Sequence, residues 1–174
     1  KTQWNQPPMN PHITLAPCRV EHYPALTAYQ LTGEQAEFSR PPSDWLSGNI
    51  PFGAAPLAVT ILRDDEPIGF FVLDSGADRD AYSTNPHAAL LRSMSLHPRH
   101  QGNGYARAAL APATLDAFIR AHLPGCDEIV LGVNHANRAA IRLYQRAGFD
   151  DTGRTYDGLK GLQFIYHRVL VREG

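Results

Sequence analysis

Two glycines, Gly102 and Gly104, lie in a polar segment between a predicted strand and a predicted helix. A glycine-rich turn in this position exposes consecutive backbone N–H groups, and the positive end of the following helix dipole adds to their effect. Glycine suits such a turn because it has no side chain to block a ligand and accepts positive φ. The segment is therefore a candidate site for a phosphate or pyrophosphate group.

Three phosphate-binding patterns can be compared with this segment. A P-loop requires Lys and then Ser or Thr after the last glycine, but Tyr105 follows Gly104. A dinucleotide fingerprint requires a third small residue where Arg107 stands. The third pattern, Gln or Arg followed by x-x-Gly-x-Gly or Ala, is met by Gln101, Gly104 and Ala106.

With this loop the chain resembles the GNAT-type N-acetyltransferases, which use acetyl-coenzyme A. Residues 133–149 strengthen the resemblance, since they are similar to the family's second cofactor motif, V-x-x-x-N-x-x-A-x-x-x-Y-x-x-x-G-F. The matching positions are Val133, Asn137, Ala140, Tyr144, Gly148 and Phe149. The two motifs follow in the family's order, one strand–helix–strand unit apart. Residues 31–38 and 68–71 look more loosely similar to the spermidine/spermine acetyltransferase-like branch.

The resemblance implies a role for each motif. Backbone amides of the loop would hold the pyrophosphate, the strand before it would pair with the pantetheine arm, and Tyr144 would protonate the departing thiolate. Direct attack of a deprotonated amine on the thioester is the implied reaction, with positioning and carbonyl polarisation supplying much of the rate. The implied cofactor-binding residues are Met94, Ser95, Leu96, Gln101, Gly102, Asn103, Gly104, Tyr105, Ala106, Arg107 and Asn137.

Each of these residues also has a structural interpretation. A tyrosine on an amphipathic helix, such as Tyr144, is usually a core packing residue. Asn137 can be a helix N-cap, a role that is compatible with contact to the cofactor. Gly102 and Gly104 can form a simple tight turn.

The general base is not identified by the motifs. Many members of the family carry a carboxylate on the strand before the loop, but residues 90–96 contain none. A water chain remains an alternative. So does a carboxylate from elsewhere, for which the candidates are Glu34, Glu37, Asp44 and Asp74.

The acceptor is expected to be a primary amine of a small molecule, such as a polyamine. Acidic residues together with Phe38 and Trp45 would suit a cationic amine in the N-terminal half. The simpler interpretation of these charges is a solvated helix face. Two other functions stay open: acetylation of a protein N-terminus or lysine, and a non-catalytic acyl-coenzyme A sensor.

Hydrophobic periodicity and breaker residues predict the elements that position these motifs. The predicted strands are 13–20, 57–62, 67–73, 89–96, 128–133 and 162–171, with a polar loop over 74–86. The predicted helices are 25–30, 33–38, 43–46, 105–123 with a kink at Pro112, and 137–147. Ser43 and Asn137 are expected as N-caps and Gly148 as a helix stop.

The expected fold is α/β (α+β): a GNAT-like mixed, mostly antiparallel sheet flanked by helices. We expect this sheet to be splayed at the cofactor site, between the strands ending near Leu96 and Val133. Residues 1–12 are predicted to be a mobile leader, and residues 13–174 a single N-acetyltransferase domain.

Composition excludes several classes of protein. A net charge of −1 over 174 residues argues against a general nucleic-acid binder. Cys18 and Cys126 stand far apart, so neither a zinc module nor a disulfide framework is indicated, and no metal is expected. No apolar run approaches the roughly 20 residues of a membrane span. We expect a cytoplasmic enzyme with no membrane partner, and we leave open a homodimer.

The near-zero net charge conceals a predicted division of charge. Arg99, His100 and Arg107 surround the presumed phosphate loop, while the acceptor half carries acidic residues. This division would suit an anionic cofactor and a cationic amine.

Overall fold

A computed structural model describes residues 12–47 and 56–170, so the predicted leader lies outside the described residues except for His12. The strands are β1 (Ile13–Pro17), β2 (Pro56–Arg63), β3 (Glu66–Asp74), β4 (Ala88–Leu96), β5 (Glu128–Asn134), β6 (Asp150–Gly158) and β7 (Gly161–Val169). The α-helices are α1 (Tyr23–Ala28), α2 (Gly33–Phe38), α3 (Pro42–Leu46), α4 (Tyr105–Leu110), α5 (Pro112–His122) and α6 (Arg138–Arg146). Short 3₁₀ turns are η1 (Val20–His22), η2 (Ala77–Ala81) and η3 (Pro98–His100).

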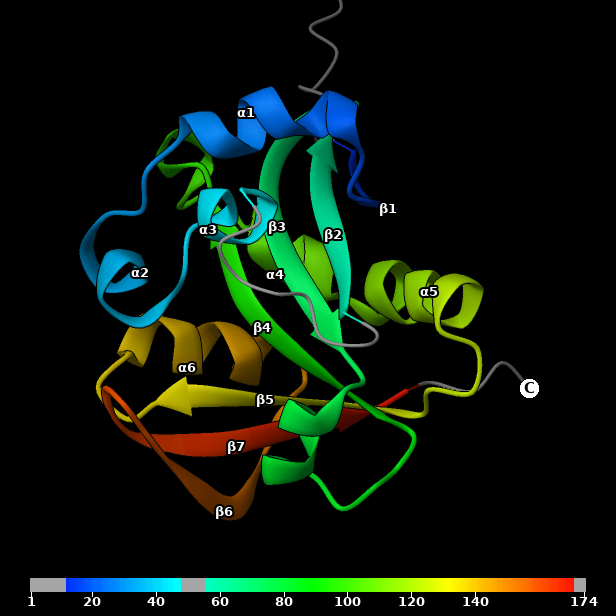
Figure 1. Cartoon of the computed structure of the whole chain (residues 1–174), viewed down its shortest axis with the longest axis vertical. Helices are drawn as coiled ribbons and strands as arrows, with labels where there is room; N and C mark the ends of the chain where they lie inside the picture. The colour runs from blue at the N-terminus through cyan, green and yellow to red at the C-terminus, as the bar shows by residue number, and fades with distance from the viewer. Residues whose placement is uncertain (1–11, 48–55, 171–174) are drawn as a thin grey trace, which may run out of the picture.

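Among the described residues, seven strands form one mixed sheet in the order β1-β2-β3-β4-β5-β7-β6. β4 and β5 run parallel, and every other neighbouring pair is antiparallel. The parallel register covers only Ala88–Leu90 against Glu128–Val130, although both strands continue beyond it. The sheet therefore opens between the C-terminal parts of β4 and β5 (Figure 1). The predicted splayed, mostly antiparallel sheet is confirmed.

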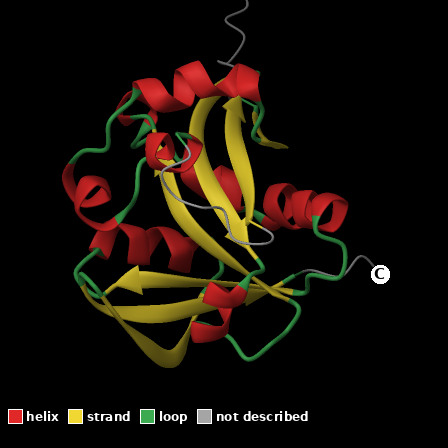
Figure 2. Ribbon diagram, in the orientation of Figure 1, coloured by secondary structure: helices red, strands yellow, loops and turns green. Residues whose placement is uncertain are grey.

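Helices cover both faces of the sheet (Figure 2). Because side chains alternate along a strand, they form one core layer on each face. On β3, Phe71 and Leu73 pack with residues of α4, α5 and α6, whereas Phe70 and Val72 pack with residues of α1 and α3. All four are fully buried. Burial of each such side chain stabilises the fold by about 1.5–3 kcal/mol, so β3 contributes to the core on both faces of the sheet.

Breaker residues shape the helices mostly as predicted. The predicted helix over 105–123 is two helices, because α4 ends at Leu110 and Ala111 takes an extended ψ of 143° before Pro112 begins α5. Asn137 caps α6, since its side chain accepts from the N–H of Ala140 at 3.2 Å. The prediction of Ser43 as an N-cap was wrong. Pro41 holds that position in α3, because its extended backbone precedes Pro42 at the first helical position.

The sequence analysis missed one strand. β6 pairs with β7 along residues 150–158, but its side chains are polar and mostly exposed, so it shows no apolar alternation. The predicted loop over 74–86 contains the short turn η2. The first predicted strand, 13–20, ends at Pro17. The last predicted strand, 162–171, spans residues 161–169, and residue 171 lies outside the described range. In the described part of the chain, no helix is long and apolar enough to cross a membrane.

Candidate active site

The glycine segment forms the turn between η3 and α4. Gly102 and Gly104 have φ values of 78° and 77°, and Gly104 is the N-cap of α4. An added Cβ at either position would meet no atom within 4 Å, so backbone conformation rather than space requires glycine here. The N–H groups that follow Gly104 in the first turn of α4 have no helical partner. The turn is exposed and precedes a helix, as the sequence predicts, and its role in binding an anion stays a prediction.

β4 is irregular where it leaves β5. Its register with β3 shifts near Ser93, a residue with φ 57°, and a bulge of this kind bends a strand and redirects its side chains. Gly69 on β3 lies opposite Leu96, and a Cβ at Gly69 would come within 2.6 Å of the Leu96 side chain and of the Ser95 carbonyl. Glycine at 69 thus lets β3 and β4 approach at the end of β4.

The three residues expected to pair with the pantetheine arm have different surroundings. Met94 packs against the apolar core. Ser95 is 2% exposed, and its hydroxyl shares a hydrogen bond of 2.9 Å with the phenol of Tyr29. The backbone N–H of Leu96 donates to the side chain of Gln35 at 3.2 Å. The end of β4 is therefore held by side chains from the N-terminal third of the chain.

Tyr144 lies on α6 and is 9% exposed. Its ring packs edge-on against Phe149 at 5.8 Å, in the same apolar cluster as Leu96, Tyr105 and Ala106. Burial raises the pKa of Tyr144 to about 12, so its hydroxyl stays protonated at neutral pH. The predicted acid thus shares one cluster with the end of β4 and the start of α4.

The two ends of α6 are fixed as the second motif predicts. Asn137 acts as the N-cap, so its side-chain oxygen is engaged by the helix. Gly148 has φ 87°, and the N–H of Phe149 donates to the carbonyl of Tyr144 at 3.0 Å, which closes the helix. These contacts set the position of the Tyr144 turn.

A buried arginine of β7 joins the two helices of the site. The guanidinium of Arg168 donates to the carbonyls of Leu110 and Ala147, both at 2.7 Å, and pairs with Asp116 at 2.6 Å. These carbonyls belong to the C-terminal ends of α4 and α6, where a cation is favoured by the helix dipole. The motifs did not point to Arg168, although a charged residue in a strongly apolar strand is a signal of this kind.

The candidate carboxylates for the general base are dispersed. Asp74 is 6% exposed and is held by Arg92 at 3.2 Å and by the N–H of Gly76 at 2.7 Å. Glu34 and Glu37 are exposed on α2, and Asp44 is half-buried on α3. The residue that follows β4 is His97 rather than a carboxylate. Its Nδ1 already accepts a hydrogen bond from the N–H of Arg99 at 3.0 Å.

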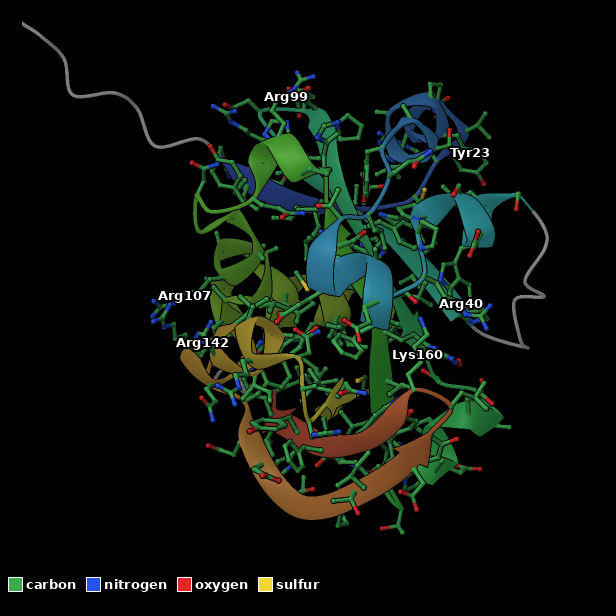
Figure 3. The ribbon with its side chains drawn as sticks, turned by 90° about the vertical axis from the view of Figure 1, so that its left-hand side faces the viewer. Tyr23, Arg40, Arg99, Arg107, Arg142 and Lys160 are labelled. Atoms are coloured by element: carbon green, nitrogen blue, oxygen red, sulfur yellow. The ribbon has the colours of Figure 1, made fainter. Side chains whose placement is uncertain are left out.

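The predicted division of charge is only partly present. Arg99 and Arg107 are exposed, but His100 is buried, and desolvation lowers its pKa, so it carries little positive charge at neutral pH. In the view of Figure 3, Arg107 of α4 and Arg142 of α6 lie on the same side of the molecule. The sequence analysis missed Arg142, although Arg138, Arg142 and Arg146 recur at the spacing of one helix face.

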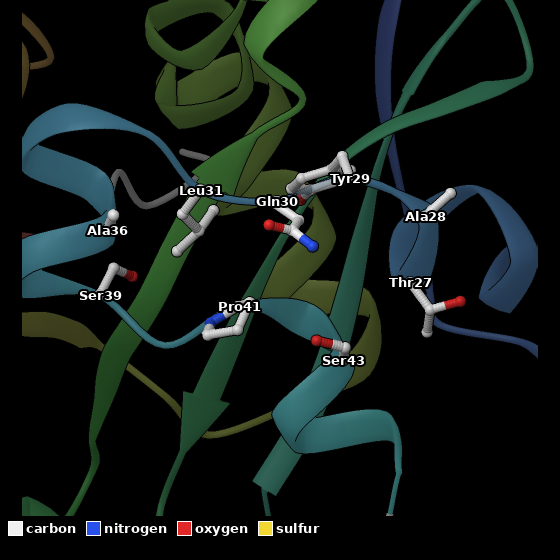
Figure 4. A pocket seen from close by; sticks show the side chains of 9 residues that line it. All are labelled: Thr27, Ala28, Tyr29, Gln30, Leu31, Ala36, Ser39, Pro41 and Ser43. Carbon is white, nitrogen blue, oxygen red and sulfur yellow. The ribbon is translucent and has the colours of Figure 1, made fainter.

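A hollow of about 360 Å³ lies among α1, α2 and α3, next to β4 (Figure 4). Tyr29 connects it to the end of β4 through the hydrogen bond with Ser95. Its lining residues are Thr27, Ala28, Tyr29, Gln30, Leu31, Ala36, Ser39, Pro41 and Ser43. None of the described residues that line it is charged, so the acidic residues expected at the acceptor do not form this wall.

No group of three or more His, Cys, Asp or Glu side chains suited to a metal ion occurs within residues 12–47 and 56–170.

The fold and these motifs define an acetyltransferase, and comparison with known proteins agrees. Residues 23–149 match the Acetyltransferase (GNAT) family. A relative from Bacillus subtilis (strain 168), described as the uncharacterized N-acetyltransferase YbbJ, is 41% identical over 163 residues, which make up 93% of this chain and 100% of the relative. The chain belongs to the GNAT family and is an acetyl-coenzyme A-dependent acetyltransferase.

Solved structures of low sequence identity share the fold. Aminoglycoside acetyltransferase AAC(6')-Ib in complex with coenzyme A is 17% identical, with a TM-score of 0.70 over 91% of this chain and 95% of that chain. Spermidine N-acetyltransferase from Vibrio cholerae, in complex with coenzyme A and spermine, is 17% identical, with a TM-score of 0.66 over 90% of this chain and 95% of that one.

Proposed function

We propose that this enzyme transfers the acetyl group of acetyl-coenzyme A to a primary amine of a small molecule, with Tyr144 as general acid. The observation that carries the proposal is the opening between β4 and β5. The glycine turn follows β4, and α6, which carries Tyr144, follows β5. The turn proposed to bind phosphate and the helix proposed to donate a proton therefore adjoin the same opening in the sheet.

In this proposal the cofactor lies across that opening. Backbone N–H groups of residues 102–107 hold the pyrophosphate, and the end of β4 pairs with the pantetheine arm. Arg107, on the helix that follows the turn, and Arg142, on the same side of the molecule in Figure 3, supply positive charge for the phosphates. The thioester then lies near Leu96 and Tyr144, which share one apolar cluster.

The acceptor approaches from the opposite face of the sheet. Tyr29 and Ser95 lie there with the hollow among α1, α2 and α3. Hydroxyl and amide groups of the lining offer hydrogen bonds to a polar small molecule. An aminoglycoside acetyltransferase and a spermidine N-acetyltransferase, the latter in complex with spermine, share this fold, which supports this choice of acceptor class.

The chemistry is a direct acyl transfer. The amine nitrogen attacks the thioester carbon, the amine proton passes to water, and the carbon–sulfur bond breaks. Tyr144 donates its proton toward the departing sulfur and regains one from solvent. We assign the amine proton to water because Asp74 is already held by Arg92 and by the N–H of Gly76.

A thiol-release assay with acetyl-coenzyme A and three panels of acceptors tests the proposal. The panels are polyamines, aminoglycosides, and peptides with a free N-terminus or lysine. Thiol release and an acetylated product with a small amine support the proposed acceptor class. Turnover with peptides alone contradicts it, and cofactor binding without turnover on any panel contradicts the proposed transfer to an amine.

A further inference from the structure

The main chain of Leu96 faces the opening between β4 and β5. The next residue, His97, donates its N–H to the carbonyl of Ile68 on β3, at 2.8 Å. Successive residues of a strand direct their N–H and C=O groups to opposite sides, so those of Leu96 point away from β3. β5 is the neighbour on that side, but its register with β4 ends at Leu90. The Leu96 groups are therefore free of strand pairing.

A carboxamide from α2 occupies both of these groups. The N–H of Leu96 donates to Oε1 of Gln35 at 3.2 Å, and Nε2 of Gln35 donates to the Leu96 carbonyl at 3.5 Å, the limit of a hydrogen bond. The Gln101 side chain also donates to this carbonyl, at 3.2 Å. Gln35 thus presents one acceptor and one donor to Leu96, as an amide of an extended ligand would.

The same helix is fastened on the other side of the opening. Lys160, in the turn between β6 and β7, donates through Nζ to the carbonyl of Glu37 at the end of α2. The carbonyl of Lys160 accepts from the side chain of Asn134, the last residue of β5, at 3.0 Å. Figure 1 shows α2 between the end of β4 and the arrowhead of β5, and in Figure 3 Lys160 lies near the lower end of α2.

Within residues 12–47 and 56–170, burial adds little to the anchoring of α2. None of its six residues is buried, so its release exposes little apolar surface. We propose that α2 is a strap across the opening, that Gln35 is its latch on β4, and that the pantetheine arm of acetyl-coenzyme A competes with Gln35 for the main chain of Leu96. This inference rests on the proposed placement of the arm along β4.

Release of the strap has a consequence for the acceptor. Ala36 and Ser39, which belong to α2 or follow it directly, line the hollow assigned to the acceptor. A cofactor that lifts α2 therefore reshapes this hollow before the amine enters. The expected kinetic order is cofactor first and amine second.

Calorimetric titration of coenzyme A into the wild-type protein and Gln35→Ala tests the latch. Removal of a competing side chain should make binding about three- to tenfold tighter, since one or two modest hydrogen bonds no longer have to be broken. Lys160→Met should give a smaller gain, and Lys160→Arg, which keeps a donor, should behave like the wild type. Gln145→Ala is the matched control, because it removes an exposed glutamine from α6 and should leave the affinity unchanged.

Each outcome of this titration has a distinct meaning. Weaker binding by Gln35→Ala would mean that Gln35 holds the ligand, and equal binding would mean that it does not compete; either result overturns the latch and leaves the proposed function standing. Failure of the wild-type protein to bind coenzyme A overturns both the proposed function and the latch. Thermal melts of the variants check that each one is folded.

Hydrogen–deuterium exchange gives a second, independent readout. Coenzyme A should raise the exchange of amides 33–38, because the strap is released, and lower that of residues 101–107, because the loop binds phosphate. Protection of both segments would overturn the strap.

Discussion

The guanidinium of Arg168 lies 2.6 Å from the carboxylate of Asp116, and both side chains are buried. The pair connects β7 to α5, while the other nitrogen of Arg168 reaches the last turns of α4 and α6. The helix after the glycine turn and the helix of Tyr144 are thus held by one cation. Their relative position is fixed by the core rather than by surface loops.

Loss of this cation should be costly. Arg168→Met should lower the free energy of unfolding by about 3–5 kcal/mol, because the buried carboxylate of Asp116 loses its charged partner. Urea unfolding followed by circular dichroism measures the change. Addition of Asp116→Leu should recover part of the loss, since an apolar pair can replace a buried ion pair. A loss below about 1 kcal/mol for the single variant would contradict this role.

Tyr144→Phe should separate catalysis from binding. The substitution removes only the hydroxyl, so kcat should fall about 100-fold while the affinity for coenzyme A changes little. Steady-state kinetics and calorimetric titration give the two values. Tyr156→Phe is the control, because Tyr156 is 36% exposed and stacks on Tyr82. Full activity of Tyr144→Phe would remove Tyr144 from the mechanism.

Gly104→Val should abolish the binding of coenzyme A. Valine at φ 77° is strained, and the turn can no longer present its N–H groups to the pyrophosphate. Gly125→Val is the matched control, since Gly125 has φ 92° before β5. Both variants should lose similar stability in thermal melts, but only the first should lose the ligand. Wild-type affinity in a folded Gly104→Val protein would contradict the loop assignment.

Alkaline pH should destabilise the protein through two buried tyrosines. Burial raises the pKa of both Tyr29 and Tyr144 to about 12, whereas a tyrosine in the unfolded chain titrates near 10. Above about pH 10 the unfolded state loses protons first, so the stability present below pH 10 declines by about 1.4 kcal/mol per pH unit for each tyrosine up to about pH 12. Urea unfolding at a series of pH values measures this slope. Tyr144→Phe should lower this slope by about 1.4 kcal/mol per pH unit, and an unchanged slope would contradict the assignment.

Elements with a strong local signal were predictable from the sequence. Pro112 stops one helix and begins another because it lacks an N–H, and Asn137 and Gly148 bound α6 by capping chemistry that acts within a few residues. The glycine turn was recognisable because positions with positive φ strongly favour glycine.

Features that depend on distant contacts were not predictable. β6 is exposed and polar, so only its pairing with β7 makes it a strand. Asp74 was a candidate general base from the sequence, but in the structure it is paired with Arg92, which is 18 residues away in the chain. Gln35 and Leu96 are 61 residues apart in the sequence, and no local pattern predicts their hydrogen bond.

The structure of the protein with bound coenzyme A tests the central claim most directly. We expect the pyrophosphate against the backbone of residues 102–107, the pantetheine arm along Leu96, and the sulfur within hydrogen-bonding distance of the Tyr144 hydroxyl. A sulfur that lies away from Tyr144, or a pyrophosphate bound elsewhere than on this turn, would contradict it.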